Sequence, residues 1–256
     1  MNLVRHRQPV SCHARKNHLL ASLPDCEWSR WLPHLELMDF SLGTVLCESS
    51  SATEYVYFPT TAVISLLCTT VDGGTSEIAM VGNDGVVGVS MIMGGNSMPN
   101  RAVVQTAGLG YRLPSTLVKT EVERAGPALQ LLLRYTQSLI AQVTQTAACN
   151  RHHDIDQQLA RRLLMALDMA SSNEVTMTQE GAAGLLGVRR EGVTAAALKL
   201  QHAGVIRYQR GHISVLDRSR LEQRTCECYR AVAKARFGLR PTALPTPFLQ
   251  PMPIAA

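Results

Sequence analysis

Residues 178–216 of the chain are TQEGAAGLLGVRREGVTAAALKLQHAGVIRYQRGHISVL, and this stretch decides the fold of the C-terminal part. Thr178 can cap a short helix over 179–186, because a threonine side chain accepts hydrogen bonds from the first free N–H groups of a helix. Gly187 supplies a permissive turn residue, and a second helix is expected from about 189 to 202. Two short helices joined by a tight turn that contains glycine are typical of a helix-turn-helix.

Two β-rich runs follow the second helix, at 205–208 and 212–216, and they flank Gln209-Arg210-Gly211. Runs of this length around a glycine turn predict a two-stranded wing. The stretch as a whole therefore predicts a winged helix-turn-helix.

The two faces of the second helix differ in chemistry. Val193, Ala197 and Leu200 can pack inward, whereas Arg190 and Glu191 lie near the N-terminal end, which enters the major groove in such motifs. The arginine fork matches guanine O6 and N7, and a glutamate can accept from cytosine N4. The alternative to DNA binding is that Arg189, Arg190 and Glu191 form only a solvated charge cluster at the start of a helix. The residues expected to bind DNA are Thr178, Arg189, Arg190, Glu191, Thr194, Lys199, Arg207 and Arg210.

Charge is distributed unevenly along the 256 residues, whose net charge is +5. Residues 1–150 hold 10 lysines and arginines against 11 acidic residues, whereas residues 151–240 hold 15 against 9. A polyanionic partner is therefore expected to meet the C-terminal part.

The N-terminal half has a different pattern. Leucines and tryptophans at helical spacing predict short helices over 18–40. From 41 to 113, short β-rich runs alternate with turn signals such as Asp72-Gly73-Gly74, which predicts an antiparallel sandwich or barrel. The runs are 44–47, 54–58, 62–68, 76–81, 102–106 and 110–113.

The longest helical pattern covers 127–152. It carries a largely apolar seam with a period of 3.5 residues, which favours contact between two copies of the helix in a homodimer. A helix that lies on its own β domain is the alternative, and both arrangements can hold together. The seam residues are Leu132, Thr136, Leu139, Val143 and Thr146, with Leu133, Ile140 and Ala147 alongside.

The chain thus has the pattern of an α+β protein with four parts. We expect an N-terminal antiparallel β domain over 18–126, a dimerisation helix over 127–152 and a winged helix-turn-helix over 153–222. Residues 223–256 are expected to form a helix and a disordered, proline-rich tail.

The C-terminal motifs resemble those of the Crp/Fnr-type transcription regulators. The motifs that carry the resemblance are Thr178-Gln179-Glu180, Leu185-Leu186-Gly187-Val188, Arg190-Glu191-Gly192-Val193, Leu198-Lys199-Leu200, Gly204-Val205-Ile206 and Ile213-Ser214-Val215. The order of parts also agrees, with a β-roll (a jelly roll like cyclic-nucleotide-binding domains) first. The resemblance implies a homodimer that reads double-stranded DNA with two-fold symmetry and controls RNA polymerase. Arg190 and Glu191 match the family's base-reading pair, whereas Ala195 replaces a third, basic reader.

The resemblance also locates an effector pocket. Family members that bind cyclic AMP use a glutamate after a Gly-rich turn, and an arginine followed by serine or threonine. The corresponding residues are Gly88, Val89, Arg101 and Ala102, so two polar partners are missing. We therefore expect no tight binding of cyclic AMP, and an unknown effector or none. Arg101 either meets another anion or pairs with Asp84.

The seven cysteines predict neither a disulfide framework nor a metal site. An Fnr-type iron–sulfur cluster needs closely spaced N-terminal cysteines, which this chain lacks. Cys149, His152 and His153 could bind haem, but capping or hydrogen bonding between domains is the more common role of such histidines. Cys226-x-Cys228 has no second pair nearby in the sequence, so zinc is not predicted. No cofactor is expected.

Other functions are less consistent with the sequence. A jelly-roll enzyme is disfavoured because residues 41–113 contain no histidine for a metal centre. A winged helix that binds protein rather than DNA stays open. No stretch approaches the roughly 20 apolar residues of a membrane span, and the N-terminus lacks the apolar block of a secretory signal, so the cytoplasm is expected.

Overall fold

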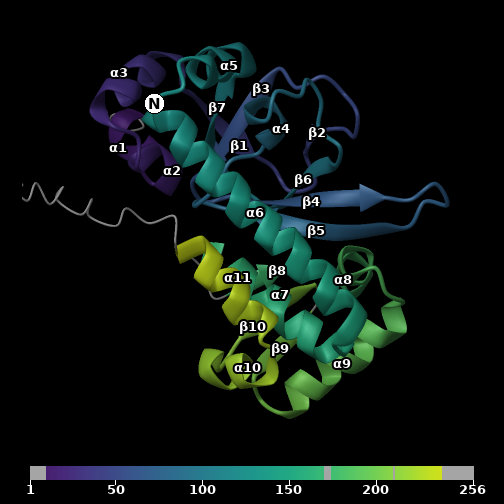
Figure 1. Ribbon diagram of the computed structural model, residues 1–256. Coiled ribbons are helices and arrows are strands. Elements are labelled where there is room, and N and C mark those ends of the chain that lie inside the picture. Colours follow the sequence, from purple (N-terminus) through teal and green to yellow (C-terminus); the bar gives the residue numbers. More distant parts are fainter. Residues whose placement is uncertain (1–9, 170–173, 210, 238–256) are drawn as a thin grey trace, which may run out of the picture.

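The structure, a computed structural model, describes residues 10–169, 174–209 and 211–237 (Figure 1). Arg210 and the proline-rich tail expected at 241–256 lie outside this part of the chain. The described residues form an N-terminal β-roll, a long helix and a C-terminal domain, which confirms the predicted fold class. Among the described helices, none is both long and apolar enough to cross a membrane.

Short helices precede the β-roll, as the spacing of leucines and tryptophans predicted. Their anchor is Asn17, which is completely buried. Its Oδ1 accepts hydrogen bonds from the backbone N–H groups of Leu19 and Leu20, and its Nδ2 donates to the carbonyls of Pro59 and Gly85. The cap therefore also fixes these helices to the β-roll. They are α1 (Val10–Ala14), α2 (His18–Ala21), α3 (Asp25–Trp31) and the 3-10 helix η1 (Leu32–His34).

The β-roll consists of two antiparallel sheets with the orders β1-β7-β3 and β2-β6-β4-β5. The turn predicted at Asp72-Gly73 closes the β4–β5 hairpin, where the backbone N–H of Thr70 donates to the carbonyl of Gly74. The strands are β1 (Glu36–Phe40), β2 (Val45–Cys47), β3 (Tyr55–Pro59), β4 (Val63–Thr69), β5 (Thr75–Val81), β6 (Arg101–Thr106) and β7 (Gly108–Pro114).

Strand β1 lies in the stretch where the sequence predicted only helices. Its residues are mostly exposed and only Phe40 is fully buried, so the strand shows little of the alternation that marks a half-buried strand. It forms because β7 offers a free edge, on which Glu36 is paired with Arg112 by an ion pair of 2.7 Å.

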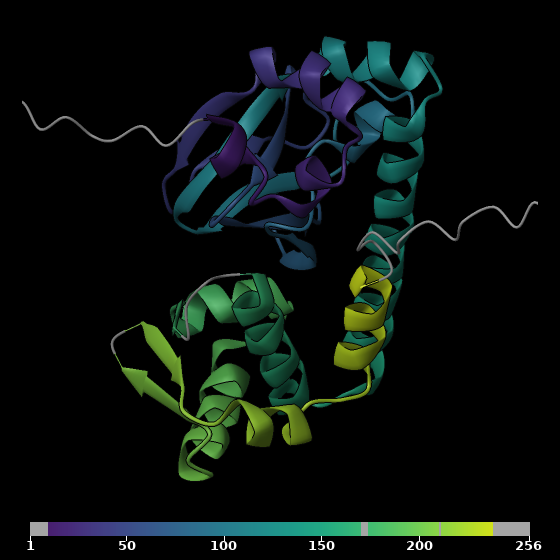
Figure 2. The same cartoon turned by 90° about the vertical axis from the view of Figure 1, so that its left-hand side faces the viewer.

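The long helix α6 (Pro127–His152) runs beside the β-roll and continues to the C-terminal domain (Figure 2). Pro127 suits the first helical position because its missing N–H would have no partner there. Leu131 and Tyr135 pack into the core of the β-roll. Two shorter helices, α4 (Val89–Ile92) and α5 (Ser115–Glu123), lie nearby.

The predicted seam of α6 faces this chain's own core. Leu132, Thr136 and Thr146 are buried, and Leu139 and Val143 pack against the β-roll clusters. The solvent-facing apolar residues are their neighbours Leu133 (48% exposed) and Ile140 (59%), together with the exposed Ala147. The predicted seam therefore packs on the chain's own β domain, which is the alternative that the sequence left open. The exposed apolar face of α6 is formed instead by the residues that directly follow seam positions, Leu133, Ile140 and Ala147.

The C-terminal domain has its own core, in which Leu159, Leu163, Val193 and Leu200 are at most 2% exposed. Its small sheet has the antiparallel order β8-β10-β9, and β8 is a strand that the sequence did not predict. The elements are α7 (Ile155–Met169), β8 (Glu174–Thr176), α8 (Gln179–Leu186), α9 (Arg190–His202), β9 (Ile206–Gln209), β10 (His212–Val215) and α10 (Arg218–Arg224). After it, α11 (Cys228–Phe237) returns to pack on α6 (Figure 2).

Candidate nucleic-acid interface

Helices α8 and α9 form the predicted helix-turn-helix. The Oγ1 of Thr178 accepts from the backbone N–H of Gly181 at 2.9 Å and so caps α8. Gly187 ends α8 with φ +66°, a left-handed conformation that favours glycine. The small residues Ala182 and Ala183 are buried, which allows α8 to pack closely on its neighbours. Thr178 therefore has a capping role.

Helix α9 buries one face and exposes the other, as predicted. Val193, Ala197 and Leu200 lie in the core, whereas Arg189, Arg190 and Glu191 are exposed at the N-terminal end. Neither arginine forms an ion pair within the part of the chain that the structure describes. These two guanidinium groups are thus free to meet an anion.

Two other predicted residues of α9 have partners within the domain. The hydroxyl of Thr194 lies 3.0 Å from Oε1 of Gln179, so it links α9 to α8. The Nζ of Lys199 lies 3.8 Å from Oδ1 of Asp156 on α7, with a largely exposed side chain. Both residues thus contact neighbouring helices, and Lys199 keeps enough exposure to reach a phosphate.

Further along α9, Leu198 and His202 are exposed residues that the sequence did not single out for contact with DNA. Ala195, Leu198 and His202 follow Glu191 at steps of four, three and four, and all four side chains are exposed. The side chain of Leu198 is 47% exposed. The helical spacing of these residues was the available signal.

Beyond α9, β9 and β10 form the predicted wing. Arg207 is exposed on β9. The Oε1 of Gln201, near the end of α9, accepts from the backbone N–H of Tyr208 at 3.0 Å. This hydrogen bond fixes the wing to α9, so Arg207 is held at a defined position beside the helix.

The β4–β5 hairpin of the β-roll contacts α8. The Thr75 hydroxyl donates to the carbonyl of Gly184 at 3.4 Å. The hairpin and the N-terminal end of α9 line a cleft of about 710 Å³ to which Arg189, Arg190 and Glu191 contribute. The N-terminal end of α9 thus lies across this cleft from the hairpin of the β-roll.

In the β-roll, apolar side chains occupy the predicted effector region. Gly88 begins α4 with φ +114°, and the side chain of Val56 lies too close to this position for a β-carbon. Val89 is 6% exposed and Ala102 is fully buried. Residues of this kind provide no hydrogen-bond partner for a sugar or a phosphate.

The charged residues of this region have partners within the chain. The Nε of Arg101 lies 3.1 Å from Oε2 of Glu48. Asp84 forms a hydrogen-bonded ion pair with Arg236 of α11. The suggested pair of Arg101 with Asp84 is therefore wrong, because α11, which lies 152 residues further along the chain, supplies the partner of Asp84.

Comparisons with known proteins agree with this arrangement. Residues 157–224 match the family model of the Crp-like helix-turn-helix domain. No curated protein sequence matches the chain. Many solved structures are similar to it.

Three of these solved structures illustrate the likeness. A protein from Eubacterium rectale assigned to the crp/fnr family of transcriptional regulators is 17% identical, with a TM-score of 0.65 over 84% of this chain and 99% of that chain. FixK2 from Bradyrhizobium japonicum is 15% identical, with a TM-score of 0.62 over 75% and 98%. A CRP-family transcriptional regulator from Thermus thermophilus is 19% identical, with a TM-score of 0.61 over 73% and 95%. The chain thus carries a Crp-like helix-turn-helix domain at residues 157–224 and has the overall fold of the Crp/Fnr-type transcription regulators.

Proposed function

We propose that this protein is a DNA-binding transcription regulator that acts in the cytoplasm as a homodimer on an operator with two-fold symmetry. One observation carries the proposal: Arg190 and Glu191 are exposed at the N-terminal end of α9, in a domain that matches the Crp-like helix-turn-helix. This end of the second helix contacts base edges in such motifs.

The chemistry of α9 suggests how it reads bases. Arg190 can donate two hydrogen bonds to guanine, and Glu191 can accept one from cytosine. One and two turns further, Ala195 and Leu198 offer apolar contact, which suits the methyl group of thymine. Arg207 on the wing can neutralise a phosphate, which adds affinity without sequence preference.

A second copy of the chain is the partner that fits the open face of α6. Leu133, Ile140 and Ala147 recur there with the seven-residue spacing that two parallel helices need. Helix α11 packs on a different face of α6, where the Nε2 of Gln145 donates to Sγ of Cys228, so it leaves the open face free. A dimer through this face presents two copies of α9, which must reach half-sites about 34–36 Å apart.

Control of binding fits a shift between two orientations of the C-terminal domain. The β4–β5 hairpin contacts α8 and lines a cleft with the N-terminal end of α9. A signal that moves the hairpin would therefore change the accessibility of Arg190 and Glu191. Because Val89 and Ala102 are apolar and buried, we do not expect this signal to be cyclic AMP. The target of the DNA-bound dimer is expected to be RNA polymerase, as the resemblance to the Crp/Fnr-type regulators implies.

The test is a pull-down of genomic DNA fragments with sequencing. We expect wild-type protein to enrich a palindromic motif, and the Arg190→Ala, Glu191→Ala double variant to lose it. A matched control replaces Arg112 and Glu36, an ion pair on the β-roll, by alanine, which removes the same charges and should leave the motif unchanged. Enrichment that survives in the double variant would refute base reading by these two residues.

A further inference from the structure

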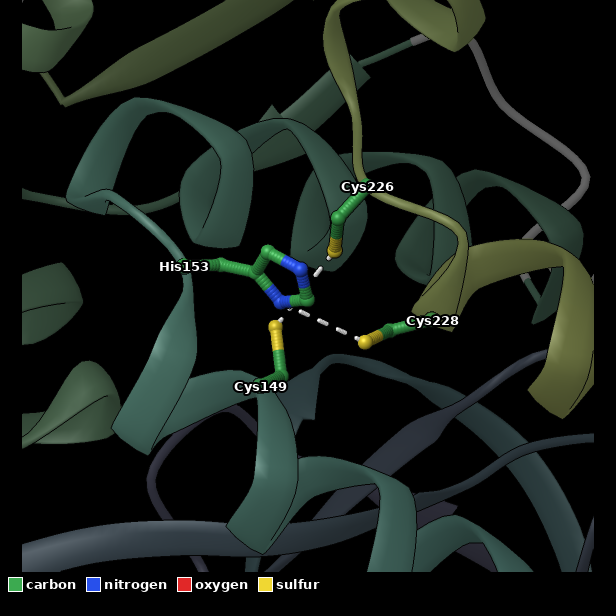
Figure 3. Close-up of side chains that lie close together, drawn as sticks. All are labelled: Cys149, His153, Cys226 and Cys228. Atoms are coloured by element: carbon green, nitrogen blue, oxygen red, sulfur yellow. Dashed lines mark hydrogen bonds between the residues drawn. The ribbon is translucent and has the colours of Figure 1, made fainter.

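Four potential metal ligands meet at the junction of α6 and α11 (Figure 3). Cys149 lies one turn before the end of α6 and His153 directly follows this helix. Cys228 is the first residue of α11, and Cys226, which lies just before it, follows Cys149 by 77 residues. Their ligand atoms all lie within 4.8 Å of one another. Folding therefore supplies the second pair of ligands that the sequence lacked around Cys226-x-Cys228.

Ordinary packing does not account for this group. Buried cysteines usually behave as small apolar residues within an aliphatic core. Here Cys149, Cys226 and Cys228 form a separate cluster with no aliphatic member, and each is at most 4% exposed. None of the three is in a disulfide, and the Sγ atoms of Cys149 and Cys226 are 3.6 Å apart, far beyond a bond of about 2.05 Å. The cluster is thus a group of buried thiols that point at one another and at an imidazole.

The spacing of the ligand atoms agrees with one tetrahedral ion. Zn–S bonds of about 2.3 Å and Zn–N bonds of about 2.0 Å place neighbouring ligand atoms about 3.5–3.8 Å apart in a tetrahedron. The Sγ atoms of Cys149 and Cys226 are 3.6 Å apart, and the Sγ of Cys228 is 3.5 Å from Nδ1 of His153. A small adjustment would place an ion at the centre.

The surroundings favour bound thiolates and a defined imidazole tautomer. The Nε2 of His153 lies 3.3 Å from a carboxylate oxygen of Glu227, which holds the proton on Nε2 and leaves Nδ1 free as a ligand. The Nε2 of Gln145 donates to Sγ of Cys228 at 3.0 Å. An amide N–H that donates to a sulfur stabilises a thiolate. Both contacts are typical of the second layer around a metal.

A buried arginine without an acidic partner also supports a metal centre at this junction. Arg161 is 5% exposed and its Nη1 donates to the hydroxyl of Thr146, but no carboxylate pairs with it among the described residues. Three thiolates, a neutral imidazole and Zn²⁺ together carry a charge of −1. Arg161 lies close enough to Cys149 to interact with it electrostatically. The positive charge of Arg161 would thus be balanced by the metal centre.

We propose that Cys149, His153, Cys226 and Cys228 bind one Zn²⁺ ion in a closed Cys₃His site. The ion joins the end of α6 to the segment that follows α10, across the junction between the long helix and the C-terminal domain. Its occupancy therefore fixes α11 on α6 and limits how far the C-terminal domain can turn. Metal binding itself does not depend on the proposed DNA binding.

The first test is the metal content of the full-length protein, purified under reducing conditions without chelator. Elemental analysis should find one zinc per chain. The Cys226→Ser, Cys228→Ser variant should lose it. The Cys26→Ser, Cys68→Ser variant should keep it, because Cys26 and Cys68 are exposed and are not members of the ligand group. Equal zinc in the two variants would overturn the proposal.

A second measurement needs no variant. The wild-type chain is stripped of metal, kept reduced and titrated with Co²⁺. Saturation at one Co²⁺ per chain, with the visible bands of tetrahedral cobalt and thiolate charge-transfer bands, would support the site. Three results would overturn it: no cobalt spectrum, iron with inorganic sulfide in the purified protein, or a disulfide between Cys149 and Cys226 in freshly isolated protein. DNA is absent from all of these assays, so they stand apart from the test of the proposed function.

Discussion

Arg162 of α7 and Glu77 of β5 form a buried ion pair that joins the C-terminal domain to the β-roll. The Nη2 of Arg162 donates to Oε2 of Glu77 at 3.0 Å, and the Nε lies 3.0 Å from Oε1. The two side chains are 4% and 9% exposed. The hydroxyl of Ser65 also donates to Glu77. Removing one partner of such a pair leaves a buried charge without compensation.

We therefore expect Glu77→Gln to destabilise the fold by about 3–5 kcal/mol, the usual cost of breaking a buried pair. Replacing both partners, with Glu77→Gln and Arg162→Met, should recover much of the loss because no charge is left buried. Urea unfolding measures both. The exposed pair of Glu36 with Arg112 is the control, and Glu36→Gln should cost less than about 1 kcal/mol. Equal losses at Glu77 and Glu36 would contradict a coupling role for the buried pair.

Substitutions at two adjacent leucines of α6 should affect stability and dimerisation separately. Leu132 is 2% exposed in the core, so Leu132→Ala should lower stability by about 2–5 kcal/mol without a direct effect on association. Leu133→Asp should instead preserve the fold and shift the protein to monomers, because it places a charge in the proposed dimer contact. Sedimentation and thermal unfolding distinguish the two. As a control, Leu37→Asp on the exposed strand β1 should leave the dimer intact; dissociation there would count against a specific contact.

Base reading and phosphate binding should respond differently to substitution. Arg190→Ala should weaken binding to the enriched motif by about 1–3 kcal/mol and relax the preference at one base pair. Arg207→Ala should weaken binding to all sequences alike and reduce the salt dependence of log K by about one unit. Fluorescence anisotropy over a range of salt concentrations measures both quantities. If Arg207→Ala altered the sequence preference instead, the assigned role of the wing would be wrong.

Cyclic AMP should not bind with micromolar affinity. The missing ribose and phosphate partners at Val89 and Ala102 should each cost on the order of 1–3 kcal/mol. Both side chains are buried, at 6% and 0% exposure, and neither has a polar atom that could bind the nucleotide. Titration calorimetry on the full-length protein tests this, and a Kd in the micromolar range or below would show that the pocket binds the nucleotide in another way.

Local features of the sequence determined the helix-turn-helix and the hairpin. Thr178 caps α8 through a neighbour three residues away, and Gly187 adopts the left-handed conformation that its turn requires. The turn after Thr70 is closed by a hydrogen bond from the backbone N–H of Thr70 to the carbonyl of Gly74, four residues away. Such elements are predictable because the interactions that form them are complete within a few residues.

Only the tertiary structure decided which face of α6 is open and where the cysteines meet. Leu132 and Leu133 are both apolar neighbours on one helix, and it is the packing of the β-roll that buries the first and exposes the second. Cys149 meets Cys226 because α11 folds back onto α6, and an ion pair between Asp84 and Arg236 holds α11 there. These contacts join segments that lie 77 and 152 residues apart, and the cost of closing such loops is repaid by the packed core as a whole rather than by any local pattern.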